Sequence, residues 1–115
     1  MSFRIVHKNT GICYFDKANE AKHFFTRLLG LMFRKSIGSE QALVFFNTSS
    51  IHTFFMRFPI DVIFLDRDMA VKRICPSLSP SRVVFCRGAF CVIECRGGEA
   101  EKKGIEVNDI VMVKK

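Results

Sequence analysis

The 115-residue sequence contains no tryptophan, no internal repeat and no segment of low complexity. It also has no apolar run long enough to cross a bilayer, because its longest apolar stretches are broken within a few residues. These absences exclude a repeat protein and argue against a membrane-spanning one. Of the residues present, 49% are hydrophobic, and thirteen phenylalanines offer benzyl groups to fill a core. We therefore expect one small soluble domain that covers residues 1–115.

Basic residues outnumber acidic ones, with 18 Lys and Arg against 11 Asp and Glu and a formal net charge of +7. Such a balance favours contact with polyanions, or simply keeps a protein soluble. The cations are scattered singly or in pairs, however, and no run of them marks an arm that binds nucleic acid. Nucleic-acid binding is therefore an alternative function and not the main prediction.

The sequence has five cysteines, an odd number, and its first residues lack the apolar core of a secretory signal peptide. A reduced, cytoplasmic setting is the expectation that follows. Cys91 and Cys95 lie in a predicted strand at a separation of about 13 Å, too far for both to bind one zinc ion. We expect no metal and no other cofactor. Cys86 and Cys91 flank a predicted turn, which leaves open a disulfide between them under oxidising conditions.

Two segments are predicted to be helical. Asp16 is expected to cap a long helix from Lys17 to about Leu31, in which apolar residues recur at helical spacing. A short helix is predicted over about 97–103, ending at Gly104.

Most of the remaining chain alternates between apolar and polar residues, as strands do. Hairpins are expected at 3–7 with 11–14 and at 60–65 with 69–74, and further strands at 42–46, 90–95 and 105–113. The predicted fold class is therefore α+β and mainly β. We expect a mostly antiparallel sheet, curled toward a barrel, with the long helix of about 17–31 covering an open side or end.

Two carboxylates fall on apolar faces of predicted strands. Asp61 shares its face with Ile63 and Leu65, and Glu94 shares its face with Phe90 and Val92. Because an unpaired buried charge is very costly, each carboxylate needs a partner. The candidate partners are Arg27, Arg34 and His52, and His52 alternates onto the same side as Phe54 and Met56.

Two sequence elements carry a family resemblance: Gly30-Leu31-Met32-Phe33-Arg34, and Met56 followed by Pro59-Ile60-Asp61. With these elements in this order, and with Glu94 and Gly97 after them, the chain resembles a family of small, uncharacterised bacterial and archaeal proteins, a domain of unknown function. The resemblance covers nearly the whole chain. It implies a compact, mostly β domain and supplies no established activity.

The first functional hypothesis is a binding module for a small molecule or a protein partner. Its partly apolar pocket would be lined by a few fixed polar groups, and the candidate residues are Arg34, His52, Met56, Asp61 and Glu94. The alternative is an enzyme in which Asp61 or Glu94 acts as general acid or base near His52, while Arg34 holds an anionic group. No nucleophile motif or phosphate-binding loop accompanies them. A purely structural polar cluster is the third interpretation.

Overall fold

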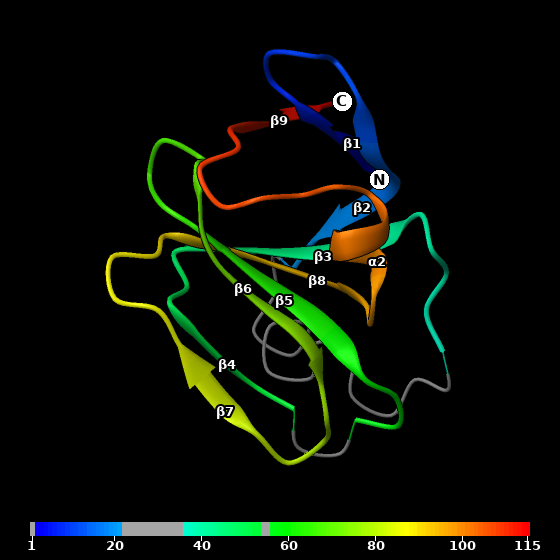
Figure 1. Ribbon diagram of the computed structural model, residues 1–115, viewed down its shortest axis with the longest axis vertical. Coiled ribbons are helices and arrows are strands. Elements are labelled where there is room, and N and C mark those ends of the chain that lie inside the picture. Colours follow the sequence, from blue (N-terminus) through cyan, green and yellow to red (C-terminus); the bar gives the residue numbers. More distant parts are fainter. Residues whose placement is uncertain (1, 22–35, 54–55) are drawn as a thin grey trace.

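The computed structural model describes residues 2–21, 36–53 and 56–115. Within these ranges a seven-stranded sheet has the order β6-β5-β8-β3-β2-β1-β9, and a two-stranded ribbon pairs β4 with β7 (Figure 1). The strands of the large sheet are β1 (Phe3–His7), β2 (Cys13–Glu20), β3 (Gln41–Phe46), β5 (Ile60–Leu65), β6 (Val71–Leu78), β8 (Cys91–Arg96) and β9 (Val111–Lys114). The ribbon consists of β4 (Ser50–His52) and β7 (Val83–Phe85), and a short helix, α2, spans Glu99–Lys102.

All strand pairs are antiparallel except β2 and β3, which run parallel. The ribbon lies at the end of the molecule away from both termini, whereas β1 and β9 lie beside the termini (Figure 1). Within the described ranges, no helix is long and apolar enough to span a membrane.

The sheet is buried on both faces around β5 and β8. Every residue of β5 is buried, and alternate residues enter two different apolar clusters. The first core contains Ile63 and Leu65 and is shared with β1, β2 and β9. The second core contains Val62 and Phe64 and lies between the sheet and the β4–β7 ribbon. Because side chains alternate along a strand, neighbouring residues of β5 belong to different environments.

The ribbon is attached to the rest of the fold by buried contacts. Ile51 of β4 packs in the second core. The hydroxyl of Thr53, which is fully buried, donates to the Ser79 carbonyl at 2.8 Å and accepts from the Arg82 backbone N–H at 2.8 Å. Arg73 of β6 donates from Nη1 to the Phe85 carbonyl at 2.7 Å. These contacts fix β4 and β7 against the second core and β6.

Several predicted elements are confirmed. The hairpins correspond to β1 with β2 and to β5 with β6, and the strands at 42–46 and 90–95 correspond to β3 and β8. The short helix predicted over about 97–103 is α2, and Gly104 after it has φ of +71°. In each case the local alternation or turn chemistry agrees with the fold.

The long helix predicted from Lys17 is wrong over its first turn. Residues 17–20 belong to β2, where Lys17 pairs with Gln41 and Ala18 with Ala42 of β3. Backbone pairing with a distant strand overrides the helical spacing of the apolar residues. Asp16 therefore lies inside a strand and caps no helix there, and residues 22–31 of the prediction lie outside the described residues.

The sheet is not closed into a barrel. Its edge strands β6 and β9 are joined just outside their bounds by an isolated bridge between Ala70 and Ile110. The disulfide left open between Cys86 and Cys91 is not formed in this structure: both cysteines are free, and Cys91 is buried in the first core whereas Cys86 packs against the second.

Replacing Thr53 with valine should destabilise the protein by about 2 kcal/mol, because the change keeps the volume but leaves two backbone groups without their hydroxyl partner. Urea unfolding measures the free energy. Ser79→Ala is the matched control, since Ser79 is exposed and contributes its backbone carbonyl to this contact. A Thr53→Val variant as stable as the Ser79→Ala variant would show that the hydroxyl is not needed.

Candidate functional site

The structure separates the two predicted carboxylates. On adjacent strands Asp61 pairs with Cys95, and Val62 pairs with Glu94. Residues paired across a sheet share a face, so Asp61 points to the side of the first core and Glu94 to the side of the second. The two carboxylates therefore lie on opposite faces of the sheet and in different surroundings.

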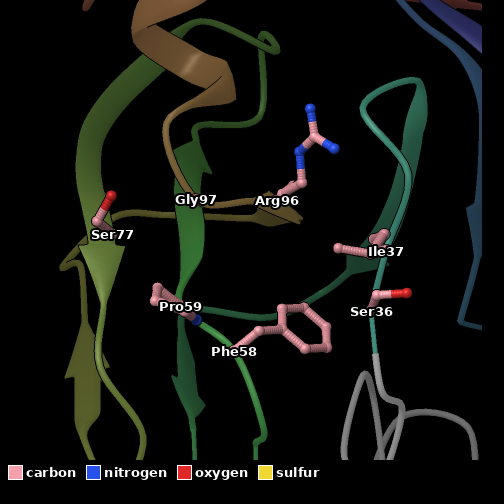
Figure 2. Close-up of a pocket in the computed structure, with 7 residues that line it drawn as sticks. All are labelled: Ser36, Ile37, Phe58, Pro59, Ser77, Arg96 and Gly97. Carbon is pink, nitrogen blue, oxygen red and sulfur yellow. The ribbon is translucent and has the colours of Figure 1, made fainter.

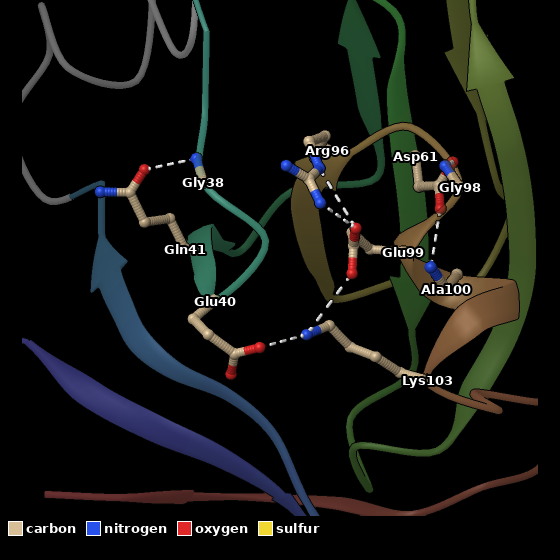
Figure 3. Close-up of polar contacts among 9 residues, drawn as sticks. All are labelled: Gly38, Glu40, Gln41, Asp61, Arg96, Gly98, Glu99, Ala100 and Lys103. Atoms are coloured by element: carbon tan, nitrogen blue, oxygen red, sulfur yellow. Dashed lines mark hydrogen bonds and ion pairs between the residues drawn. The ribbon is translucent and has the colours of Figure 1, made fainter.

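Asp61 is fully buried, and backbone amides surround its carboxylate. Oδ1 accepts a hydrogen bond from the N–H group of Ser77 at 2.8 Å. Oδ1 also accepts one from Gly98 at 2.9 Å, and Oδ2 accepts one from Ala100 at 2.8 Å (Figure 3). Gly98 is the N-cap residue of α2, and no side chain of α2's own N-terminal turn caps it. Asp61 thus caps the helix from β5 and holds β6 beside it, which is a structural role.

Among the described residues, Glu94 has no backbone donors like those of Asp61. It is 4% exposed and lies between the buried side chains of Leu43 on β3 and Val62 on β5. Burial raises the pKa of Glu94 to about 8. Within the described ranges no ion pair joins its carboxyl group to another side chain, and burial is the cause of its raised pKa; Arg27 lies outside these ranges. Near neutral pH the group is therefore mostly protonated.

The remaining predicted pocket residues are spread out. Met56 is buried in the second core, on the same side of the sheet as Glu94. His52 is half-buried in β4, and because its neighbour Ile51 points into the second core, the imidazole lies on the other face of the ribbon. Arg34 lies outside the described residues. Only Met56 and Glu94 are thus placed on a common face.

An ion-pair network connects α2 to the end of β8 and to the segment before β3. Arg96 donates from Nε and from Nη2 to Oε2 of Glu99, at 3.1 and 2.7 Å respectively (Figure 3). The Nζ atom of Lys103 lies 3.6 Å from Oε1 of Glu99 and 2.9 Å from Oε2 of Glu40. Burial alone would raise the pKa of Glu99, but the hydrogen bonds and charge of Arg96 outweigh it, so the pKa lies below its ordinary value. The network fixes the guanidinium of Arg96 at the sheet end.

A pocket of about 280 Å³ lies at the end of the second core beside this guanidinium. Its wall is mainly apolar, with the Phe58 ring below and the Arg96 side chain above in the close-up (Figure 2). The lining residues are Ser36, Ile37, Phe58, Pro59, Ser77, Arg96 and Gly97. Arg96 uses Nε and Nη2 for Glu99, so its Nη1 group takes no part in these two hydrogen bonds.

Gly97, which lines this pocket, lies close to the backbone of Pro59. Its N–H donates to the Pro59 carbonyl at 3.2 Å, and a Cβ at this position would lie 3.1 Å from the same oxygen. A larger residue would push the two segments apart. The close approach of backbone to backbone explains the need for glycine here.

Sequence reasoning missed most of this pocket. It treated Arg96 as one of many scattered cations and Phe58 as core. The available signal was the alternation in β8, which places Arg96 on the same face as Glu94, two residues and about 7 Å along the strand. Nothing local indicated that residues 36–37 and 58–59 would meet there.

The comparison with protein families matches residues 6–113 to DUF192, described as "Uncharacterized ACR". The chain belongs to the DUF192 family. The family resemblance inferred from sequence is thereby confirmed at the level of the family. A UPF0127 protein of Pyrococcus horikoshii is 38% identical over 112 residues, covering 91% of this chain and 94% of that protein.

Two solved structures share the DUF192 fold seen here. A Novosphingobium aromaticivorans protein of unknown function has a TM-score of 0.78 and 24% identity, covering 95% of this chain and 91% of that one. A Sinorhizobium meliloti protein described as a candidate transcription regulator has a TM-score of 0.82 and 18% identity, covering 98% and 96%. At these identities the likeness shows the fold alone.

Substitution of Asp61 should strongly destabilise this DUF192 domain. Asp61→Ala removes three charge-assisted hydrogen bonds and leaves buried N–H groups unsatisfied, so we expect a loss of about 3 kcal/mol or more in the free energy of unfolding. Asp61→Asn should lower the free energy of unfolding by less, because the side-chain oxygen of asparagine can still accept hydrogen bonds in place of Oδ1. The exposed Asp68→Asn change is the control and should stay within about 0.5 kcal/mol. Similar urea midpoints for the Asp61 and Asp68 variants would contradict the capping role.

Glu94 should make stability fall as pH rises. Its pKa is about 8 in the folded protein against an ordinary value of 4.5, so the folded state binds more protons between these values. The free energy of unfolding should decrease by up to about 1.4 kcal/mol per pH unit across this window and level off above it.

Glu94→Gln should remove this decrease and stabilise the protein at the alkaline end, because glutamine stays neutral. The check is urea unfolding of both proteins from about pH 5 to about pH 9. Glu106→Gln, an exposed site, controls for the loss of a negative charge. If the wild type and Glu94→Gln curves run parallel throughout, Glu94 does not titrate as described.

Proposed function

We propose that the chain is a binding module for a small molecule that has an apolar body and one anionic group. The observation that carries this proposal is the pocket of about 280 Å³ with the fixed Arg96 guanidinium at its edge. Small-molecule sites are mostly apolar, with few polar groups that set orientation. A pocket of this size is at the lower end of that class, so the ligand is of metabolite size.

Charge supports the anionic group. Arg96 is held by two hydrogen bonds to Glu99, so its orientation is set before a ligand arrives. A guanidinium held in this way loses little side-chain entropy when it binds a carboxylate or phosphate. Within the network Glu99 and Glu40 balance the charges of Arg96 and Lys103, so an anion would be held by the directed N–H groups of the guanidinium.

The apolar part of the ligand would contact Phe58, Pro59 and Ile37. Phe58 is half-buried, and its ring occupies one side of the cavity in the close-up (Figure 2). An aromatic or aliphatic group placed against it would remove apolar surface from water, at about 25 cal/mol per Å². The hydroxyl of Ser77 adds a polar group at the rim.

This pocket is lined by residues other than those that the sequence analysis expected. It lies on the side of Met56 and Glu94 but is lined by other residues, while Asp61 acts on the opposite face. The binding-module hypothesis is therefore kept with a new set of residues.

Phenylacetate is a suitable first probe, because it joins a ring to a carboxylate. At about five times its Kd it should stabilise the protein by about 1 kcal/mol, which corresponds to a rise in Tm of about 4 °C or more. The neutral isostere phenylacetamide should give a smaller rise on the same protein. Differential scanning fluorimetry measures both.

Arg96→Gln should abolish the difference between the acid and the amide, whereas Arg4→Gln, an exposed arginine on β1, should preserve it. Amide shifts in a ¹⁵N spectrum should be largest at Ser77 and Gly97 and absent at Gly11, which lies in the β1–β2 turn. Equal responses to acid and amide, or shifts away from Ser77 and Gly97, would count against this site; a flat response to a wider panel of carboxylates and phosphates would reject the binding function.

A further inference from the structure

The β4–β7 ribbon carries large apolar side chains on its outer surface. Val83 is 63% exposed and Phe85 is 67% exposed, although both lie in a regular strand. They are two residues apart and therefore share one face of the ribbon. Across the ribbon Val83 pairs with His52 and Phe85 with Ser50, so the imidazole of His52 lies on this same face.

Cations surround this face. Arg82 and Arg87 are exposed at the two ends of β7, and Lys72 and Arg73 are exposed on the neighbouring strand β6. Arg73 is held at β7 by its hydrogen bond to the Phe85 backbone carbonyl. The ammonium nitrogen of Lys72 lies next to the turn that follows β7, at 3.4 Å from the position that a Cβ atom on Gly88 would occupy.

No carboxylate balances these charges. Residues 69–93 contain no Asp or Glu. Among the residues that the structure describes, the ion pairs involve His7, Arg96 and Lys103, all of them outside the ribbon and β6, and none involves Lys72, Arg73, Arg82 or Arg87. The ribbon surface therefore combines exposed apolar groups with uncompensated positive charge.

We propose that this ribbon surface, made of Phe85, Val83, His52 and the four cations, binds single-stranded nucleic acid. Exposed aromatic side chains on strands stack with unpaired bases, and arginine and lysine contact the phosphates. Three of the four cations are arginines, whose planar guanidinium suits phosphate oxygens. The site shares no lining residue with the pocket near Arg96, and the proposal does not rest on ligand binding there.

The same features favour nucleic acid over an anionic membrane. Stable attachment to a bilayer requires a wide apolar face or a lipid anchor in addition to charge. The ribbon offers only Val83 and Phe85 as exposed large apolar side chains. A base stacked on one ring, with phosphates held on either side, needs no larger apolar area.

The test uses fluorescein-labelled oligothymidylate and oligouridylate of about twelve nucleotides, a length within the usual site size of single-strand binders. Fluorescence anisotropy of the wild-type protein should show binding whose affinity falls with salt, with a log–log slope of about −2 to −3, as expected for contacts to three or four phosphates. Phe85→Ala should weaken binding about tenfold, and Arg87→Ala should make the slope less steep by about 0.7.

Matched variants separate stacking from general attraction. Phe85→Trp should retain binding because the indole also stacks, whereas Phe85→Leu should bind as weakly as Phe85→Ala. Val107→Ala and Lys102→Ala remove an exposed apolar group and an exposed cation elsewhere, and should bind like the wild type. Because Phe85 is exposed, the melting temperature of its variants should stay close to that of the wild type.

Four results would overturn the proposal. Equal affinity of the wild type and Phe85→Ala would show attraction by charge alone, as would inorganic polyphosphate competing equally well against both. Full binding by Phe85→Leu would show an aliphatic contact and not stacking. Capture by phosphatidylserine vesicles that depends on Phe85, without binding to either oligonucleotide, would identify the ribbon surface as a membrane contact.

Discussion

The buried carboxylate of Asp61 joins three parts of the chain that are distant in sequence. Its strand, β5, lies between β6 and β8 in the sheet, and the hydrogen bonds of its carboxylate reach Ser77 on β6 and the backbone at the start of α2. A buried negative charge requires donors, and backbone N–H groups supply them without a counter-ion. Once α2 is fixed, Glu99 and Lys103 are also fixed, and Glu99 orients Arg96. The geometry of the pocket edge therefore depends on a residue on the other face of the sheet.

Because the sheet is buried on both faces, its two buried carboxylates, Asp61 and Glu94, lie in different environments. Along β5 and β8 each step of one residue changes the environment, so the structural carboxylate and the titrating carboxylate lie close in the sheet yet in separate cores. Asp61 meets organised backbone donors, whereas Glu94 meets Leu43 and Val62. The carboxyl group of Asp61 thus acts as a helix cap, whereas that of Glu94 has a raised pKa and favours its neutral form.

The sequence predicted those parts of the fold that are determined locally. The β5–β6 hairpin follows from alternation on either side of a polar turn, and α2 ends at a glycine with positive φ. The alternation also placed Asp61 and Glu94 correctly on apolar faces of their strands, but it did not show whether the two residues point to the same face of the sheet. The opposite parity of the two residues becomes visible only when β5 is paired with β8 in register.

Two errors have a common physical origin. Residues 17–20 have helical spacing, but their partner is β3, more than twenty residues away, and the parallel ladder determines their conformation. The pocket likewise depends on segments around Ile37, Phe58 and Arg96 that no local pattern connects. Long-range pairing of this kind is set by the tertiary fold, and a single sequence carries little direct signal for it.

The strand order also constrains how the chain can fold while it is being synthesised. β3 pairs with β8, and β1 pairs with β9. The strands that are synthesised first therefore cannot complete their pairing until the end of the chain has been synthesised. Between Phe46 and Cys91 the ribosome needs roughly 2 to 9 s at usual rates of synthesis. During that interval the edge of β3, with Leu43 and Phe45, lacks the strand that later covers it. The nascent protein therefore presents an open apolar strand edge, a form that is prone to association with other chains and suited to recognition by chaperones.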